Sequence, residues 1–214
     1  MSELTRLDSV GVSLGGVTVL TDVSLQLGSG EAIAIVGPNG SGKTTVLRLL
    51  ATLLRPTHGT GTILGADLGG VVDRSVRTSI GLITHAPSLL DELTISENLI
   101  HFCRVSGRDE EAIPKALSAV GLENVAARAV ARCSFGMKRR AEIAWLLVAK
   151  PRLLLLDEAR SGLDAEARIL VDSLARLTRE RGGGVVSVSH GEGDPGPDLV
   201  AVHRLEDGRL VQVS

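Results

Sequence analysis

The sequence predicts an α/β fold in which a parallel sheet lies between layers of helices, a three-layer core. Short apolar runs at residues 32–36, 153–156 and 185–189 are typical of strands buried on both faces. Segments with helical apolar spacing alternate with these runs, and that alternation favours a parallel sheet. Between the first and second runs, residues 95–150 show helical periodicity throughout, so we expect an inserted helical lobe there.

The smaller elements follow from local patterns. Alternating apolar and polar residues at 23–27 predict a half-buried strand, and residues 62–64 and 79–84 resemble further strands. A helix with Val46, Leu47, Leu50 and Leu54 on one face is expected after a glycine-rich loop, and another from Asp164 onward. Near the end of the sequence, Asp207-Gly208 separates two apolar stretches, which predicts a β-hairpin of residues 200–205 and 209–213.

The composition excludes several classes of function. The formal net charge is −2, without the basic surplus of nucleic-acid-binding proteins, so we expect no nucleic-acid partner. Aromatic residues make up 1% of the chain, which leaves few platforms for base stacking. No apolar run approaches the roughly 20 residues of a membrane-spanning helix. Cys103 and Cys133 lie far apart without metal-type spacing, and we expect two buried or half-buried thiols in a reducing compartment.

A glycine-rich motif follows the first buried run. Residues 37–44 match G-x-x-x-x-G-K-[ST] between a strand and an amphipathic helix. In such a loop backbone N–H groups surround phosphate oxygens, the lysine contacts the β- and γ-phosphates, and the hydroxyl ligates Mg²⁺. The alternative, a plain glycine turn before a helix, is disfavoured by the flanking elements. The predicted nucleotide-binding residues are Gly37, Pro38, Asn39, Gly40, Ser41, Gly42, Lys43, Thr44 and Thr45, with Thr44 also on the metal.

Two carboxylates end the second buried run. Asp157 and Glu158 directly follow four leucines, and the carboxyl ends of parallel strands face the ligand crevice of such sheets. We expect Asp157 to hold Mg²⁺, directly or through water, and Glu158 to act as the general base that activates the attacking water. A strand that simply ends in a polar turn is the alternative, and the phosphate loop weighs against it.

With these motifs, the chain resembles the ATPase subunits of ABC transporters over nearly its whole length. Three further segments carry the resemblance, in the family's order. Residues 133–137, Cys-Ser-Phe-Gly-Met, are similar to the family's signature, Leu-Ser-Gly-Gly-Gln. Residues 161–164, Ser-Gly-Leu-Asp, are similar to its D-loop, and His190 follows a strand like the family's switch histidine.

The resemblance implies a P-loop core with an N-terminal antiparallel β subdomain and an inserted helical signature subdomain. Residues 1–214 would form one domain, with the core at 1–90 and 151–214 and the helical subdomain at 91–150. Two subunits, a homodimer or a pair of ATPase subunits, would enclose ATP and Mg²⁺, with Ser134 and Gly136 of one subunit on the γ-phosphate held by the other.

The resemblance also implies catalytic roles for Glu158, His190 and His85. ATP hydrolysis would drive transport through integral membrane subunits, and the chain would lie peripherally on the cytoplasmic face of the cell membrane.

Several positions depart from the family's pattern. His85 stands where a glutamine approaches Mg²⁺ and water, and a neutral histidine also offers an acceptor nitrogen there; an exposed loop histidine is the alternative. Phe135 replaces a signature glycine, so its ring would pack against the partner subunit or obstruct closure, and Met137 replaces the glutamine. Leu14 stands where an aromatic residue stacks on adenine, and we expect only an apolar contact from it.

The cargo and one alternative function stay open. Residues 80–85, 93–99 and 134–140 resemble the haem-exporter ATPases of cytochrome c maturation, but drug, lipid and polysaccharide exporters have similar short ATPases. A non-hydrolysing ATP-binding module that regulates or dimerises is the second hypothesis; Glu158 favours hydrolysis, whereas His85 and Phe135 leave this alternative open. A soluble ABC-type ATPase of translation or DNA repair is disfavoured, because such proteins usually have tandem cassettes or long coiled-coil insertions. Residues 101–103, His-Phe-Cys, are expected to pack in a core rather than to ligate haem.

Overall fold

The computed structural model describes residues 2–190 and 199–213, without the side chain of His190. The chain forms two compact units. The core unit consists of Met1–Leu82, Pro151–Glu158 and Leu177–Ser214, and the helical unit consists of Ile83–Lys150 and Ala159–Arg176. These boundaries differ from the predicted 91–150 because the segment after Ile83 and the segment after Ala159 are bonded to the helix that carries Arg139 and Arg140.

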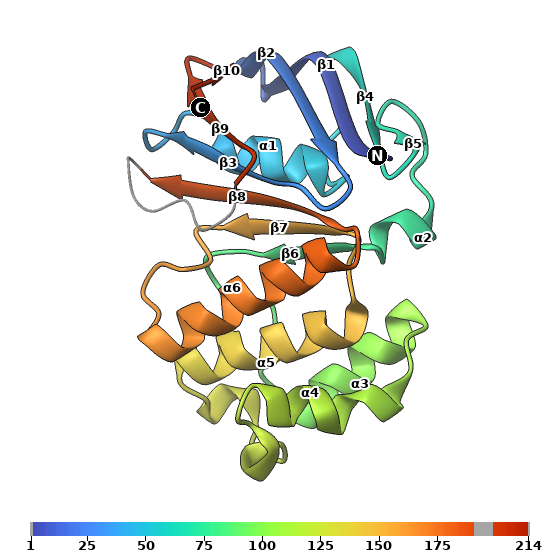
Figure 1. Ribbon diagram of the computed structural model, residues 1–214, viewed down its shortest axis with the longest axis vertical. Helices are drawn as coiled ribbons and strands as arrows, with labels where there is room; N and C mark the ends of the chain where they lie inside the picture. The colour runs from blue at the N-terminus through green and yellow to red at the C-terminus, as the bar shows by residue number, and fades with distance from the viewer. Residues whose placement is uncertain (1, 191–198, 214) are drawn as a thin grey trace. The chain divides into compact units, whose positions relative to one another are not determined.

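One side of the core unit is an antiparallel sheet (Figure 1). The strands are β1 (Glu3–Leu14), β2 (Val17–Gly28), β4 (His58–Ile63) and β5 (Ala66–Asp67). β1 pairs with β2 on one edge and with β4 on the other. Local patterns did not predict β1. Its register shifts, one of them next to Ser9 with φ 46°, interrupt the alternation that would have revealed it.

The other part of the sheet is mostly parallel and contains the buried strands. Its strands are β3 (Ala32–Gly37), β6 (Ile80–Ile83), β7 (Leu153–Asp157), β8 (Gly184–His190) and β9 (Ala201–Glu206), followed by β10 (Arg209–Gln212). β3 lies between β9 and β8, β7 pairs with β8, and all three pairings are parallel. Every residue of β3 and β7 is buried, as predicted for strands covered on both faces. The strand order is β5-β4-β1-β2-β10-β9-β3-β8-β7-β6, and the predicted α/β class is confirmed.

The predicted C-terminal hairpin is also confirmed. β9 and β10 pair in antiparallel fashion, with Arg209 opposite Glu206. Asp207 and Gly208 both adopt positive φ angles, 47° and 72°, as a tight two-residue hairpin turn requires. β10 then joins the two parts of the sheet by pairing with β2.

Helix α1 (Lys43–Leu50) lies against β2, β3, β7 and β8 in the core unit. Its apolar face, with Val46, Leu47 and Leu50, belongs to the main hydrophobic core. The helix ends at Leu50, not at the predicted Leu54, because Thr52 has a φ of 58°, which a right-handed helix cannot accommodate. A single short helix, α2 (Arg74–Arg77), precedes β6.

The helical unit contains α3 (Ile95–Ser106), α4 (Ile113–Ala119), α5 (Phe135–Ala149) and the first turns of α6 (Ala165–Glu180). The helical lobe expected at residues 95–150 is present, and the structure divides it into separate helices. Gly107 and Gly121, with φ of 68° and 69°, turn the chain after α3 and α4, and single 3₁₀ turns at Glu110–Ala112, Glu123–Val125 and Val130–Arg132 form the connections. Within the described part of the chain, no helix combines the length and the apolarity needed to cross a bilayer.

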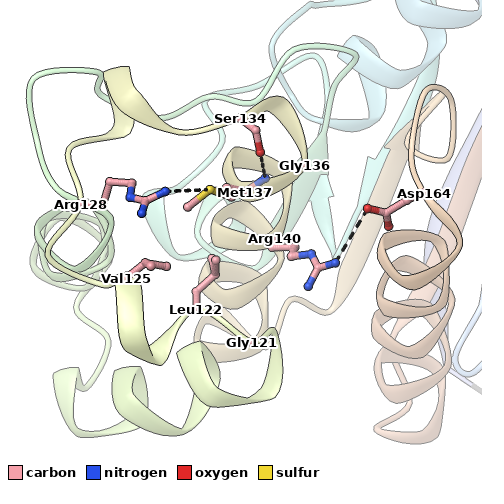
Figure 2. Close-up of a pocket in the computed structure, with 9 residues that line it drawn as sticks. All are labelled: Gly121, Leu122, Val125, Arg128, Ser134, Gly136, Met137, Arg140 and Asp164. Atoms are coloured by element: carbon pink, nitrogen blue, oxygen red, sulfur yellow. Dashed lines mark hydrogen bonds and ion pairs between the residues drawn. The ribbon is translucent and has the colours of Figure 1, made fainter.

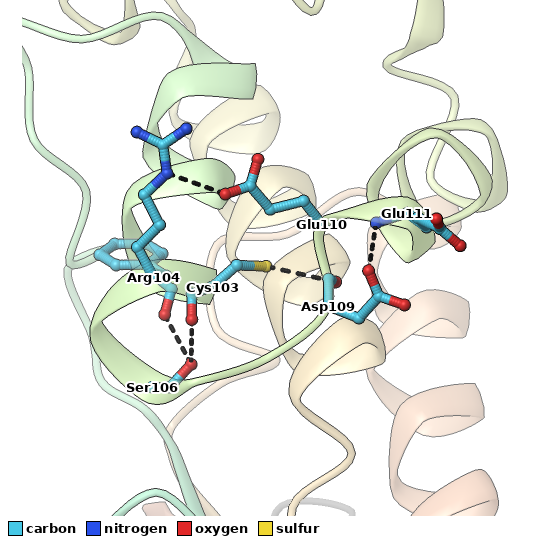
Figure 3. Close-up of polar contacts among 7 residues, drawn as sticks. Cys103, Arg104, Ser106, Asp109, Glu110 and Glu111 are labelled. Atoms are coloured by element: carbon cyan, nitrogen blue, oxygen red, sulfur yellow. Dashed lines mark hydrogen bonds and ion pairs between the residues drawn. The ribbon is translucent and has the colours of Figure 1, made fainter.

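Cys103, near the end of α3, contacts the connection from α3 to α4 (Figure 3). Cys103 is fully buried, its Sγ lies 3.7 Å from the Asp109 carbonyl oxygen, and burial raises the pKa of its thiol. The Phe102 ring contacts the Trp145 ring of α5, with 5.4 Å between centroids. These contacts agree with the packing expected for Phe102 and Cys103, whereas His101 is exposed and does not belong to the core.

Candidate functional site

The phosphate loop connects β3 to α1 in the core unit. Lys43 is the first residue of α1, with 5% of its surface exposed. Its Nζ donates to the carbonyl oxygens of Gly37 at 2.8 Å and Pro38 at 2.7 Å. Burial lowers the pKa of Lys43, and the charges of Glu158 and Asp157 oppose that shift. The lysine therefore holds the two ends of the loop together, beside two carboxylates.

The backbone of the loop requires glycine at its junction with α1. Gly42 has a φ of 102°, and a Cβ added there would lie 2.9 Å from Leu20 Cδ2 of β2. Between these ends, Pro38, Asn39 and Gly40 are exposed. Ser41 Oγ is buried and has no hydrogen-bond partner among the described residues. A loop with exposed backbone at its tip and a buried hydroxyl in need of a partner is suited to an anion.

The predicted metal ligands of the core unit lie next to each other. Thr44 is exposed and its Oγ1 donates to Asp157 Oδ2 at 3.2 Å, although 113 residues separate them. Burial raises the pKa of Asp157, and the hydrogen bond from Thr44 lowers it. A hydroxyl and a carboxylate are oxygen ligands of the kind that Mg²⁺ prefers, and they suit a cation that also binds substrate phosphates. Thr45, in contrast, is buried.

Glu158 follows Asp157 at the carboxyl end of β7. Its backbone has a φ of 52°, an uncommon conformation for a residue other than glycine, and its N–H donates to the Val188 carbonyl oxygen of β8 at 3.0 Å. The side chain is half-buried. The chain thus turns sharply after Asp157, at the carboxyl end of β7.

Two further predicted residues belong to the core unit. His190 is the last residue of β8 and its backbone lies opposite Gly37 of the phosphate loop, but its side chain lies outside the described residues. Leu14 ends β1 opposite Val17, with 39% of its surface exposed. Val19 and Leu20 of β2 lie next to Gly42 of the loop, and local patterns did not single them out.

The signature residues line a pocket of the helical unit (Figure 2). Ser134 is the N-cap of α5, and its Oγ accepts a hydrogen bond from the Met137 N–H at 3.2 Å. A pocket of about 310 Å³ opens beside this helix start. Arg140 lies in it and pairs with Asp164 of the D-loop segment at 3.9 Å and with Glu166 at 2.8 Å. The lining residues are Gly121, Leu122, Val125, Arg128, Ser134, Gly136, Met137, Arg140 and Asp164.

His85 lies in the segment that follows β6, also in the helical unit. Its side chain is exposed, and its backbone carbonyl accepts a hydrogen bond from Arg139 Nη2 at 3.0 Å. Arg139 and Glu142 form a buried ion pair on α5. Neither residue was predicted to act near His85. The only available signal was a glutamate three residues after an arginine on a helix, a spacing that is common on solvent-exposed faces.

The comparisons with known proteins agree with this geometry. The model of the ABC transporter family matches residues 20–161, which is more than half of the chain. The chain belongs to the ABC transporter family. Domains of this family bind ATP with Mg²⁺, as the sequence predicted, and the loop of Lys43 with the Thr44–Asp157 pair fits both.

Relatives and solved structures give the same assignment. Nod factor export ATP-binding protein I of Rhizobium leguminosarum bv. viciae is 38% identical over 86% of this chain and 60% of that protein. Methionine import ATP-binding protein MetN of Cupriavidus metallidurans is 37% identical over 82% of this chain and 54% of that protein. An ATP-binding cassette solved as a dimer, in a post-hydrolysis state bound to ADP and Pi, superposes with a TM-score of 0.82 at 25% identity, over 98% of this chain and 99% of that chain. The chain therefore spans little more than half of the length of these two curated ABC relatives.

Proposed function

We propose that this chain hydrolyses ATP in a two-subunit sandwich and that the cycle drives transport through a partner membrane protein. One observation carries the proposal: Lys43, the Thr44–Asp157 pair and Glu158 converge at the carboxyl ends of β3 and β7. Lys43 would neutralise the β- and γ-phosphates, and Thr44 and Asp157 would hold Mg²⁺. Glu158 would accept a proton from the attacking water.

The signature pocket would supply the second half of each site. Ser134 is exposed at the N-terminus of the fifteen-residue helix α5, and Gly136 lies in its first turn. An oxygen-rich anion is favoured at such a helix start by the free N–H groups and the helix dipole. We therefore assign Ser134 and Gly136 to the γ-phosphate bound by a second subunit, and His85 and His190 to the surroundings of the attacked phosphate.

The membrane partner and cargo are also part of the proposal. Leu90 is 42% exposed, and the Asn98 side chain hydrogen-bonds both the N–H and the carbonyl oxygen of the Leu90 backbone. This loop therefore presents an apolar residue on a fixed backbone. A peripheral position on the cytoplasmic face of the membrane follows from such a partner. Haem export stays a prediction of the sequence resemblance. The two relatives above are named for Nod factor export and methionine import, and we propose that the membrane partner selects the cargo.

The substitution Glu158→Gln tests hydrolysis and dimerisation together. The amide retains size and hydrogen bonding but does not accept the proton, so ATP with Mg²⁺ should accumulate a dimer in size-exclusion chromatography while phosphate release falls at least about 100-fold. Glu123→Gln, an exposed glutamate on the 3₁₀ turn at Glu123–Val125, is the matched control and should behave as wild type.

The same experiment distinguishes ATP hydrolysis from the alternative function. A non-hydrolysing ATP-binding module would dimerise with ATP in both wild type and Glu158→Gln, without phosphate release in either. Wild-type rates of phosphate release in Glu158→Gln would contradict the role of Glu158.

A further inference from the structure

Arg139 is a buried cation in the interior of the helical unit. Only 1% of its side chain is exposed, in the second turn of α5. A guanidinium removed from water is unfavourable unless charged and carbonyl acceptors replace the water. Its Nη1 donates to the Glu142 carboxylate one turn further along the helix, and its Nη2 donates to the carbonyl oxygens of Thr84 at 2.7 Å and His85 at 3.0 Å.

Glu142 continues the connection to the same segment. It is 5% exposed, and while Oε2 faces Arg139, Oε1 accepts a hydrogen bond from the Ser88 N–H at 3.3 Å. Burial raises the pKa of Glu142, and the Arg139 charge and the Ser88 N–H oppose that shift. Segment 84–88 is thus bonded to α5 at both ends. Arg139 donates to two carbonyl oxygens at its start, and Glu142 accepts from one N–H at its end.

Phe135, a residue of the signature segment, contacts Arg139. Its ring centroid lies 5.6 Å from Arg139 Cζ, in the geometry of a cation–π contact between residues one helical turn apart. Phe135 itself is 42% exposed. From the sequence we expected Phe135 to pack against a partner subunit or to obstruct closure. Within the chain, its ring contacts the guanidinium of Arg139, which donates a hydrogen bond to the His85 carbonyl oxygen.

We propose that Arg139 and Glu142 are positioning residues that fix segment 84–88, and with it the direction of the His85 side chain, and that Phe135 shields this pair from water. The planar guanidinium is suited to this task, because its fork of N–H groups serves a carboxylate and two carbonyls simultaneously. The effect on turnover rests on the proposed function, whereas the effect on the segment does not. The competing explanation is that the buried pair only stabilises α5. The two experiments below distinguish this explanation from a positioning role.

The first experiment replaces the pair by apolar side chains of similar size. The double substitution Arg139→Met with Glu142→Leu should melt close to the wild-type temperature, because well-packed apolar residues often replace a buried ion pair without loss of stability. Hydrogen exchange of the amides at 84–90 should nevertheless be about tenfold faster or more, since the segment loses three hydrogen bonds. The matched control is Arg104→Met with Glu110→Leu, which removes an exposed ion pair of the same unit. It should leave exchange at 84–90 unchanged.

Unchanged exchange at 84–90 overturns the proposal, whether or not the protein hydrolyses ATP. If the double variant does not fold, Arg139→Lys serves instead. It keeps the charge but cannot reach three acceptors in the planar geometry of the guanidinium, so exchange at 84–90 should again be faster than in wild type.

The second experiment asks whether the pair acts through His85. Arg139→Lys should lower kcat by about 10- to 100-fold and change the KM for ATP by less than about twofold, because small misplacements of a catalytic group cost turnover more than binding. In a His85→Ala background the same substitution should change kcat by less than about twofold. Equal losses in both backgrounds would overturn the proposal in favour of a purely stabilising pair. If wild type releases no phosphate, the proposed function fails, and hydrogen exchange alone decides on the positioning role.

Discussion

Removal of the Lys43 ammonium tests the phosphate loop most directly. Lys43→Met retains the apolar stem of the side chain, so the packing of α1 against the sheet should be preserved. The substitution deletes the two hydrogen bonds from Nζ to the Gly37 and Pro38 carbonyl oxygens. Among the described residues these carbonyls use two of the three N–H groups of the ammonium, which leaves the third for a phosphate oxygen.

The structure sets the expected size of both effects. Each lost hydrogen bond contributes a net ~0.5–1.5 kcal/mol, so the free energy of unfolding should fall by about 1–3 kcal/mol. For a chain of 214 residues this lowers Tm by roughly 2–12 °C. A charge-assisted contact to phosphate is worth more than a neutral one, and its loss should weaken ATP binding at least ~10-fold, or about 1.4 kcal/mol.

The assay combines thermal unfolding by circular dichroism with titration of a fluorescent ATP analogue in Mg²⁺. Lys115→Met, on the exposed face of α4, is the matched control and should change neither quantity. An unchanged Tm in Lys43→Met would show that the two carbonyl contacts do not stabilise the fold. Wild-type ATP affinity in the same variant would refute the assignment of the loop.

Two further predictions concern the core unit. Thr44→Val removes the hydroxyl that bonds Asp157 without changing the shape of the side chain, so ATP binding should lose most of its dependence on Mg²⁺. Titration of ATP with and without EDTA measures this dependence. Equal Mg²⁺ dependence in the variant and the wild type would contradict Thr44 as a ligand. Burial lowers the pKa of His203 on β9, so as pH falls below about 6.5 the unfolded chain binds a proton that the folded chain does not, and stability falls. His203→Gln should weaken this pH dependence in urea unfolding between about pH 7.5 and 5.5, and parallel curves for the two proteins would refute it.

Local sequence was sufficient for the elements whose structure depends on neighbouring residues. The runs at β3 and β7 are buried along their whole length, as four or five consecutive apolar residues predict. The Asp207-Gly208 turn follows from two residues that tolerate positive φ. Local patterns failed where the chain departs from regular geometry, as in the shifted register of β1 and the early end of α1 at Thr52.

The motifs by themselves determined which residues belong to a phosphate loop, an acidic strand end and a signature segment, because each is a run of adjacent residues with its own chemistry. Only the tertiary structure decided what those residues contact. Thr44 meets Asp157 across 113 residues of chain, and Arg139 meets the His85 carbonyl across 54. A charged side chain can be buried only where the fold brings acceptors from distant segments to replace its water, and no local pattern specifies which segments those are.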